Sequence, residues 1–96
     1  MPTLSISIVT PTDGSTVFSP IPVSGTYSCP TPNPTIDCSL QDSSGTTVAS
    51  TATTGTGGQW SATLTVSQGY TGASITATLG GTQARASVGN LTVDVT

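Results

Sequence analysis

Hydrophobic and polar residues alternate along most of this 96-residue chain. In "QWSATLTV", at residues 59–66, Trp60, Ala62, Leu64 and Val66 occupy every second position, with polar residues between them. Successive side chains of a β-strand point to opposite faces, so this period of two predicts a strand with one buried face. Since no window carries the 3.6-residue period of a helix, the pattern predicts an all-β protein.

Six further segments show the same alternation, at residues 3–9, 21–29, 35–41, 46–52, 73–79 and 83–96. Turn-forming residues such as Asp13-Gly14 separate them. In the last segment the apolar phase slips between Val88 and Leu91. A bulge at Gly89-Asn90 corrects the slip, because one extra residue changes the face on which later side chains lie. Seven strands spaced about ten residues apart predict one β-sandwich domain over residues 1–96.

Composition removes several functional classes. Ser and Thr supply 35 of the 96 residues, whereas the charged residues are four Asp and one Arg, with no Lys, Glu or His. Phosphate groups are held mainly by Lys and Arg, so the chain is not expected to bind nucleic acid or an anionic membrane surface. A hydroxyl nucleophile needs a base, and neither His nor Lys is present to serve. We therefore expect no enzyme activity.

Metal and cofactor binding are also poorly supported. Two cysteines without a histidine do not complete a tetrahedral zinc site. Calcium prefers several oxygen ligands, so Asp13 or Asp42 with nearby loop carbonyls could hold one weakly. Both residues lie in predicted turns, where Asp commonly bonds its own backbone. The sequence therefore favours a turn-forming role for each and predicts no cofactor.

The aromatic residues offer one candidate ligand contact. Tyr27 and Trp60 occupy inward positions of their predicted strands, which favours core packing for both. Tyr70, in the loop "QGYTG", is the aromatic residue expected to be exposed. A sugar-binding platform needs exposed flat rings, so Tyr70 is a candidate contact for a glycan.

Several stretches together resemble a known family. They are "IVTPTDGSTVFSPIPVSGTYS", "LQDSSGTTV", "GGQWSATLTVSQGYTGASITATL" and a final "VGNLTVDV". The combination is similar to the bacterial Ig-like domains, which occur as repeats in surface adhesins and as accessory domains of secreted polysaccharide-degrading enzymes. The resemblance implies a seven-stranded Ig-like or fibronectin III-like Greek-key sandwich, and it carries over no catalytic residue.

The two cysteines bracket the proline-rich loop "CPTPNPTIDC". Cys29 and Cys38 both fall on the apolar phase, and in an Ig-like sandwich their strands belong to opposite sheets. The even count and the lack of other ligands predict a disulfide that ties the two sheets together. The alternative is a pair of reduced cysteines that act as small hydrophobic residues.

These features predict a non-catalytic spacer or adhesion-stalk module of a larger exported bacterial protein, whose partners are the neighbouring domains of its own chain. We expect it outside the cell or at the cell surface. The first ten residues lack the pattern of a signal peptide, so the export signal is expected outside these residues. No apolar run approaches the roughly 20 residues of a membrane span. One alternative is a module that binds a glycan or a surface receptor through loops at one end. Another is a decoration domain of a phage virion.

Overall fold

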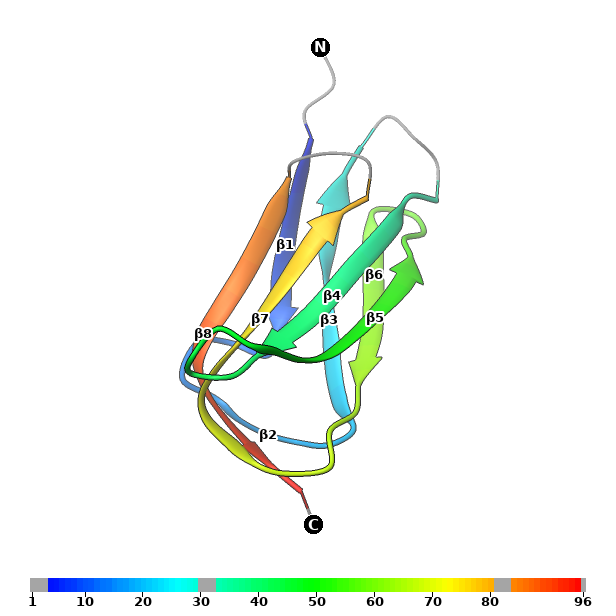
Figure 1. Ribbon diagram of the computed structural model, residues 1–96. Coiled ribbons are helices and arrows are strands. Elements are labelled where there is room, and N and C mark those ends of the chain that lie inside the picture. Colours follow the sequence, from blue (N-terminus) through cyan, green and yellow to red (C-terminus); the bar gives the residue numbers. More distant parts are fainter. Residues whose placement is uncertain (1–3, 30–32, 81–83, 96) are drawn as a thin grey trace.

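The computed structural model describes residues 4–29, 33–80 and 84–95. Within these ranges the chain forms eight strands and no helix (Figure 1). The strands are β1 (Ser5–Thr10), β2 (Thr16–Phe18), β3 (Ile21–Ser28), β4 (Thr35–Gln41), β5 (Thr47–Thr54), β6 (Gln59–Leu64), β7 (Tyr70–Leu79) and β8 (Arg85–Asp94). The all-β prediction is confirmed.

The strands form two sheets that face each other as a sandwich (Figure 1). One sheet has the order β1-β3-β6, and the other has the order β2-β8-β7-β4-β5. Neighbouring strands are antiparallel except for β2 and β8, which are parallel. The predicted Ig-like sandwich is confirmed, with eight strands in place of seven. The additional strand is β2, whose three residues are too few to show an alternating pattern.

The core lies between the sheets and is apolar throughout the described residues. Its buried members are Ile21, Val23, Ile36, Cys38, Leu40, Trp60, Leu64, Ala73, Ile75, Ala77, Leu79, Val88, Leu91 and Val93. Strands β4, β6 and β7 supply nine of these fourteen residues. Trp60 is buried as predicted, and Tyr27 is half-buried against the core.

The predicted bulge in the last strand is present. Ile75 lies opposite Val88 and Ala73 lies opposite Leu91, so β8 uses one residue more than β7 in this interval. Asn90 adopts a φ of 55° there. A second irregularity, which the alternation in the sequence does not predict, follows on β7 around Gly72, at a φ of 68°. The two irregularities oppose each other, so the inward faces of both strands stay aligned.

The sandwich is elongated, with extents of 43 × 21 × 19 Å. The beginning of β1 at Ser5 and the end of β8 at Asp94 lie toward opposite ends of the long axis (Figure 1). The described chain therefore enters the domain at one end and leaves it at the other.

Candidate functional site

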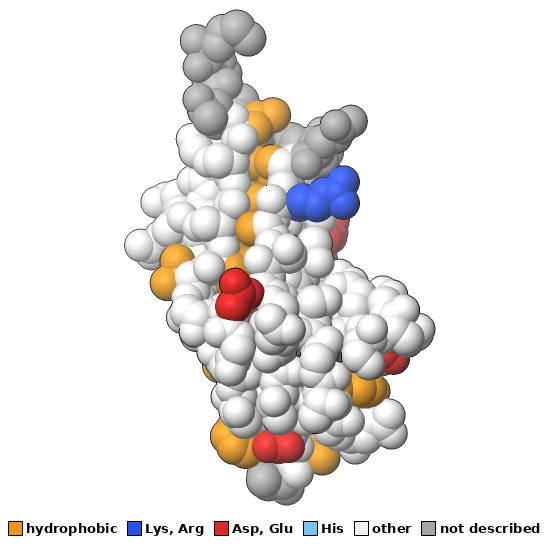
Figure 2. All heavy atoms as spheres, turned by 90° about the vertical axis from the view of Figure 1, so that its left-hand side faces the viewer, with side chains coloured by type: hydrophobic (Ala, Val, Ile, Leu, Met, Phe, Trp, Pro, Cys, Tyr) orange, Lys and Arg blue, Asp and Glu red, His pale blue; other side chains and the backbone are white. Residues whose placement is uncertain are grey.

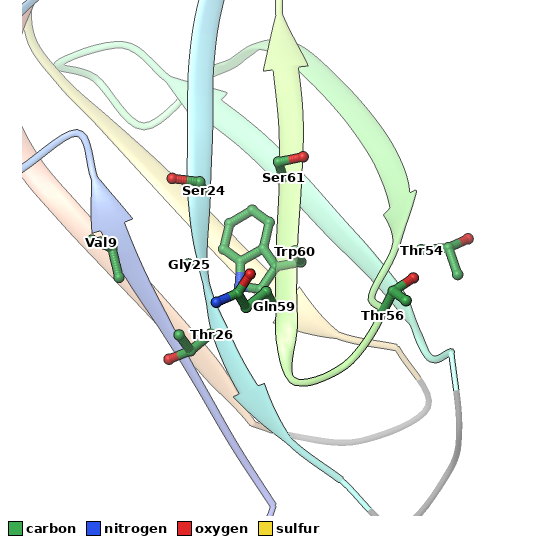
Figure 3. A pocket seen from close by; sticks show the side chains of 9 residues that line it. All are labelled: Val9, Ser24, Gly25, Thr26, Thr54, Thr56, Gln59, Trp60 and Ser61. Carbon is green, nitrogen blue, oxygen red and sulfur yellow. The ribbon is translucent and has the colours of Figure 1, made fainter.

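A shallow depression of about 450 Å³ lies on the outer face of the three-stranded sheet. It is lined by Val9, Ser24, Gly25, Thr26, Thr54, Thr56, Gln59, Trp60 and Ser61 (Figure 3). The lining residues come from β1, β3 and β6, and from the end of β5 with the turn that follows it. Its volume falls in the range of small-ligand pockets, about 300–1,000 Å³.

Trp60 lies beneath this surface, and its indole is fixed by a glycine. Gly25 and Trp60 are directly opposite in the β3–β6 register. The indole Nε1–H reaches across β3 and donates to the carbonyl oxygen of Ser7, at 3.2 Å. A Cβ on Gly25 would lie 1.8 Å from that carbonyl oxygen and 2.8 Å from Nε1. The missing side chain of Gly25 therefore makes room for a contact that joins all three strands.

The remaining walls carry polar groups without charge. Ser24 lies opposite Ser61, and Thr26 lies opposite Gln59, so four polar side chains form a block on two adjacent strands. Hydroxyl and amide groups can both donate and accept hydrogen bonds. With Val9 as an exposed apolar neighbour, the depression suits a neutral polar ligand and offers no acid or base.

A second depression, of about 440 Å³, lies on the outer face of the five-stranded sheet. Hydroxyl groups line it as well, but it also includes the exposed carboxylate of Asp37. Asp37 lies opposite Thr78, which in turn lies opposite Arg85, the only cationic side chain of the protein. The two depressions are thus similar in size and different in charge.

Comparison with known families identifies the domain. The family model described as the immunoglobulin-like domain of bacterial spore germination (Gmad2) matches residues 5–86. The chain belongs to this family. Membership agrees with the resemblance to bacterial Ig-like domains, whereas the adhesin and enzyme settings remain predictions.

No curated protein gives a significant match to this Ig-like domain. Among solved structures, an engineered protein determined at 1.98 Å aligns with 21% sequence identity and a TM-score of 0.47. The alignment covers 100% of the present chain and 20% of that protein. The Ig-like domain therefore spans about a fifth of the length of that structure.

The predicted disulfide between Cys29 and Cys38 is absent, and both cysteines of the Ig-like domain are free thiols. Gly55 shows why. Its N–H donates to the carbonyl of Pro34, and a Cβ on it would lie 2.4 Å from the ring of Tyr27, so Tyr27 and Pro34 lie at one level. Cys29 is two residues beyond Tyr27, whereas Cys38 is four residues along β4 in the opposite direction. At roughly 3.3 Å per residue this stagger far exceeds the span of a disulfide.

The two thiols have different surroundings. Cys38 is buried between the sheets, and burial raises its pKa to about 11, with a further contribution from the negative charge of Asp37. Cys29 is only half-buried, just after the end of β3. Both pack against the apolar core, as the alternative interpretation of the sequence proposed.

Tyr70 does not form an exposed platform. It was expected in a loop, but it is the first residue of β7, lies opposite Val93 and is half-buried against the core. The exposed aromatic residue of the described chain is instead Phe18, at the end of β2. Residues 30–32 of the proline-rich loop lie outside the described residues.

Asp13 and Asp42 are both engaged in local structure. Asp13 Oδ1 accepts the N–H of Gly89 at 2.7 Å, which joins the first turn to the bulge of β8. Asp42 Oδ1 accepts from the hydroxyl of Ser44 at 2.7 Å and from the N–H groups of Ser44 and Thr46 at 2.9 and 3.0 Å. The Ser44 hydroxyl, followed by the backbone donors, lowers the pKa of Asp42. These bonds favour the turn-forming interpretation over calcium binding.

No three His, Cys, Asp or Glu side chains gather as a potential metal site in the part of the chain that the structure describes. The same residues include no helix with the length and hydropathy needed to cross a membrane.

Proposed function

We propose that this Ig-like domain is a non-catalytic spacer module of a larger exported bacterial protein. The observation that carries the proposal is the position of Ser5 and Asp94 toward opposite ends of an axis of 43 Å. A polypeptide that passes through such a domain is extended by the length of the domain. Its partners are then the neighbouring domains of the same chain, as in an adhesion stalk.

The interior supports a mechanical role. The core residues of β4 and β7 are at most 1% exposed, and no buried side-chain polar atom of the described chain lacks a hydrogen-bond partner. Close packing of this kind resists deformation. The depression over Trp60 is lined by no acidic or basic side chain, which agrees with a non-catalytic module.

A replacement experiment in the natural gene product tests the spacer role. The domain is deleted in one strain and exchanged for an unrelated Ig-like sandwich of equal length in another. Antibody labelling of a flanking domain on intact cells measures how far that domain is presented. We expect the exchange to preserve labelling and the deletion to reduce it. Equal loss in both strains, or no labelling of intact wild-type cells, contradicts the proposal.

The uncharged depression over Trp60 favours a second candidate function, the binding of a neutral glycan. Its hydroxyl and amide groups match the donors and acceptors of a sugar, and the apolar contact comes from Val9. This location replaces the end-loop site suggested by Tyr70. The candidate does not depend on the spacer role, because the depression lies on the side of the sandwich and not at its ends.

The only tryptophan of the protein lines this depression, so its fluorescence reports binding directly. Neutral oligosaccharides are titrated against the wild type, Gln59→Ala and the control Ser50→Ala, which alters the second depression. We expect Gln59→Ala to weaken binding at least fivefold and the control to leave it unchanged. No fluorescence change at millimolar sugar, or equal effects of both variants, contradicts the candidate.

A further inference from the structure

Strand β1 is an open edge of the three-stranded sheet. It pairs with β3 on one side, and no described strand pairs with it on the other. Its sequence, "SISIVT", contains no charge and no proline. Proteins commonly protect an open edge with charged side chains or proline, because its free N–H and C=O groups can pair with another strand. Strand β1 has neither protection.

The side of the sandwich next to this edge is apolar. Ile6 and Ile8 of β1 are only half-buried, although both point toward the core. Figure 2 views the side formed by β1 and β8 and shows a column of hydrophobic side chains in its upper half. The neighbouring edge of β8 is covered by β2 only at Thr92–Asp94.

The exposed apolar residues also favour β1 over the other open edges. Four large hydrophobic residues are exposed in the described chain, and two of them, Leu4 at 46% and Val9 at 56%, lie beside or within β1. The edge strands β5 and β6 on the opposite side contribute none. The remaining edge strand, β2, carries exposed Phe18 but has only three residues, so β1 is the longest open edge at which exposed apolar surface lies.

We propose that two copies of this chain associate through antiparallel pairing of their β1 strands. A two-fold axis at Ser7 places Ile6 opposite the partner's Ile8, and the reverse pair follows by symmetry. Such a pairing joins two three-stranded sheets into one of six strands and covers the half-buried isoleucines. The inference is independent of the proposed spacer function.

Charge and shape favour a second copy as the occupant. Identical edges meet, so a charge on β1 would face its own copy and repel it. All four aspartates lie outside β1, at positions 13, 37, 42 and 94. The order serine, isoleucine, serine, isoleucine also keeps its alternation when the strand direction is reversed, so both copies bury their isoleucines on the same face.

The size of the edge sets the expected strength. Six residues span about 20 Å along the strand, and the sandwich is 19–21 Å across. The contact therefore covers about 800 Å² in total over both copies, below the roughly 1,200 Å² of a stable interface. We expect a weak dimer that forms at high micromolar concentration.

Sedimentation equilibrium between 10 µM and 1 mM tests the pairing with two matched variants. Ser7→Lys places two like charges at the two-fold axis, whereas Ser50→Lys adds the same charge to the opposite edge strand β5. Both side chains are exposed, and both variants have the same net charge. We expect dimerisation at least tenfold weaker in Ser7→Lys and unchanged in Ser50→Lys.

Hydrogen exchange of the wild type provides a measurement that needs no variant. Amide protons within residues 5–9 should exchange more slowly at 1 mM than at 10 µM, while those of β5 should not change. The proposal is overturned if the wild type stays monomeric at 1 mM, if both lysine variants weaken the dimer equally, or if the added protection falls on β5.

Discussion

The two sheets of this domain are stabilised in different ways. In the five-stranded sheet, the inward residues of β4 and β7 are at most 1% exposed, so burial of apolar side chains dominates. In the three-stranded sheet, Ile6 and Ile8 are half-buried, and an inward position of β3 is a glycine. That sheet depends on the fit of Trp60 over Gly25 and on its bond to Ser7. Ile21, Val23 and Leu64 of β3 and β6 are also fully buried, so the difference between the sheets lies in the half-buried edge strand β1 and in the close approach at Gly25.

Gly25→Ala is the sharpest way to break this difference. The new Cβ would lie 1.8 Å from the carbonyl oxygen of Ser7, which is backbone and cannot rotate away. Strand β1 or the indole must move, and the Trp60 bond is lost. We expect a loss of more than about 3 kcal/mol of unfolding free energy, measured by denaturant titration with Trp60 fluorescence.

Gly89→Ala is the matched control for that change. A Cβ on Gly89 meets nothing within 4 Å, and its φ is not positive. We expect stability within about 0.5 kcal/mol of the wild type. Similar losses in Gly25→Ala and Gly89→Ala would show that close packing at Gly25 is not what holds the three-stranded sheet.

The next largest expected effect is the difference in stability lost when a buried and a half-buried isoleucine are truncated. Ile75, in the middle of β7, is 0% exposed, whereas Ile6 on the open edge is half-buried. Ile75→Ala should cost about 3–4 kcal/mol and Ile6→Ala about 1 kcal/mol, because truncation cost follows the buried volume that is removed. Thermal unfolding of both variants measures the difference, and equal costs would mean that β1 is as well packed as β7.

Sequence pattern predicted the strands of both sheets, and its two misses both lie in the five-stranded sheet. The alternation of β4 and β7, and the bulge at Gly89-Asn90, follow from a period that buried strands impose on their residues. Strand β2 was not predicted because its three residues are too few to show a period of two. The irregularity at Gly72 was not predicted because the first residues of β7, beginning at Tyr70, were assigned to a loop.

The alternation of apolar and polar residues could not predict the candidate site. The contact between Trp60 and Ser7 passes over Gly25, and periodicity does not show which glycine lies under a ring. The disulfide prediction failed for a related reason. Strand parity correctly directed Cys29 and Cys38 toward the core, but parity says nothing about the stagger between strands of opposite sheets.

The cysteines extend the comparison to chemical reactivity. Cys38 is buried, and its pKa of about 11 lowers the small fraction of reactive thiolate further at neutral pH, whereas Cys29 is half-buried. A thiol reagent should modify Cys29 first, and Cys38 at least a hundredfold more slowly, at the rate of unfolding. Mass spectrometry of the denatured, non-reduced protein should find two free thiols. A single disulfide there would restore the prediction made from the sequence.

Alkaline pH acts on the same thiol. The pKa of Cys38 is 9.0 when unperturbed and about 11 in the fold, so the unfolded chain loses its proton first. Stability should therefore fall as pH rises from about 9 to 11. Cys38→Ala removes the ionising group, and its stability should fall less over that interval. If the stability of the wild type and of Cys38→Ala falls equally between pH 9 and 11, ionisation of Cys38 is not the cause of the loss.

Asp42 gives the smallest expected effect, in the turn that joins β4 to β5 of the five-stranded sheet. Its carboxylate accepts three hydrogen bonds from Ser44 and Thr46, and these bonds lower its pKa below the ordinary value of 3.8. Because the pKa of Asp42 is lower in the fold than in the unfolded chain, its ionised carboxylate stabilises the fold at pH values above the ordinary pKa. This stabilisation is lost as the pH falls through the folded pKa. Asp42→Ala should therefore melt slightly below the wild type at pH 7, by less than Ile6→Ala, and the difference should shrink below pH 3.8. The turn between β5 and β6, which connects the two sheets, is closed by two backbone bonds between Thr56 and Gln59 and involves no carboxylate, so Thr56→Ala should show no such dependence on pH. A constant difference between Asp42→Ala and the wild type from pH 7 to pH 2 would assign the effect to packing of the turn and not to the charge.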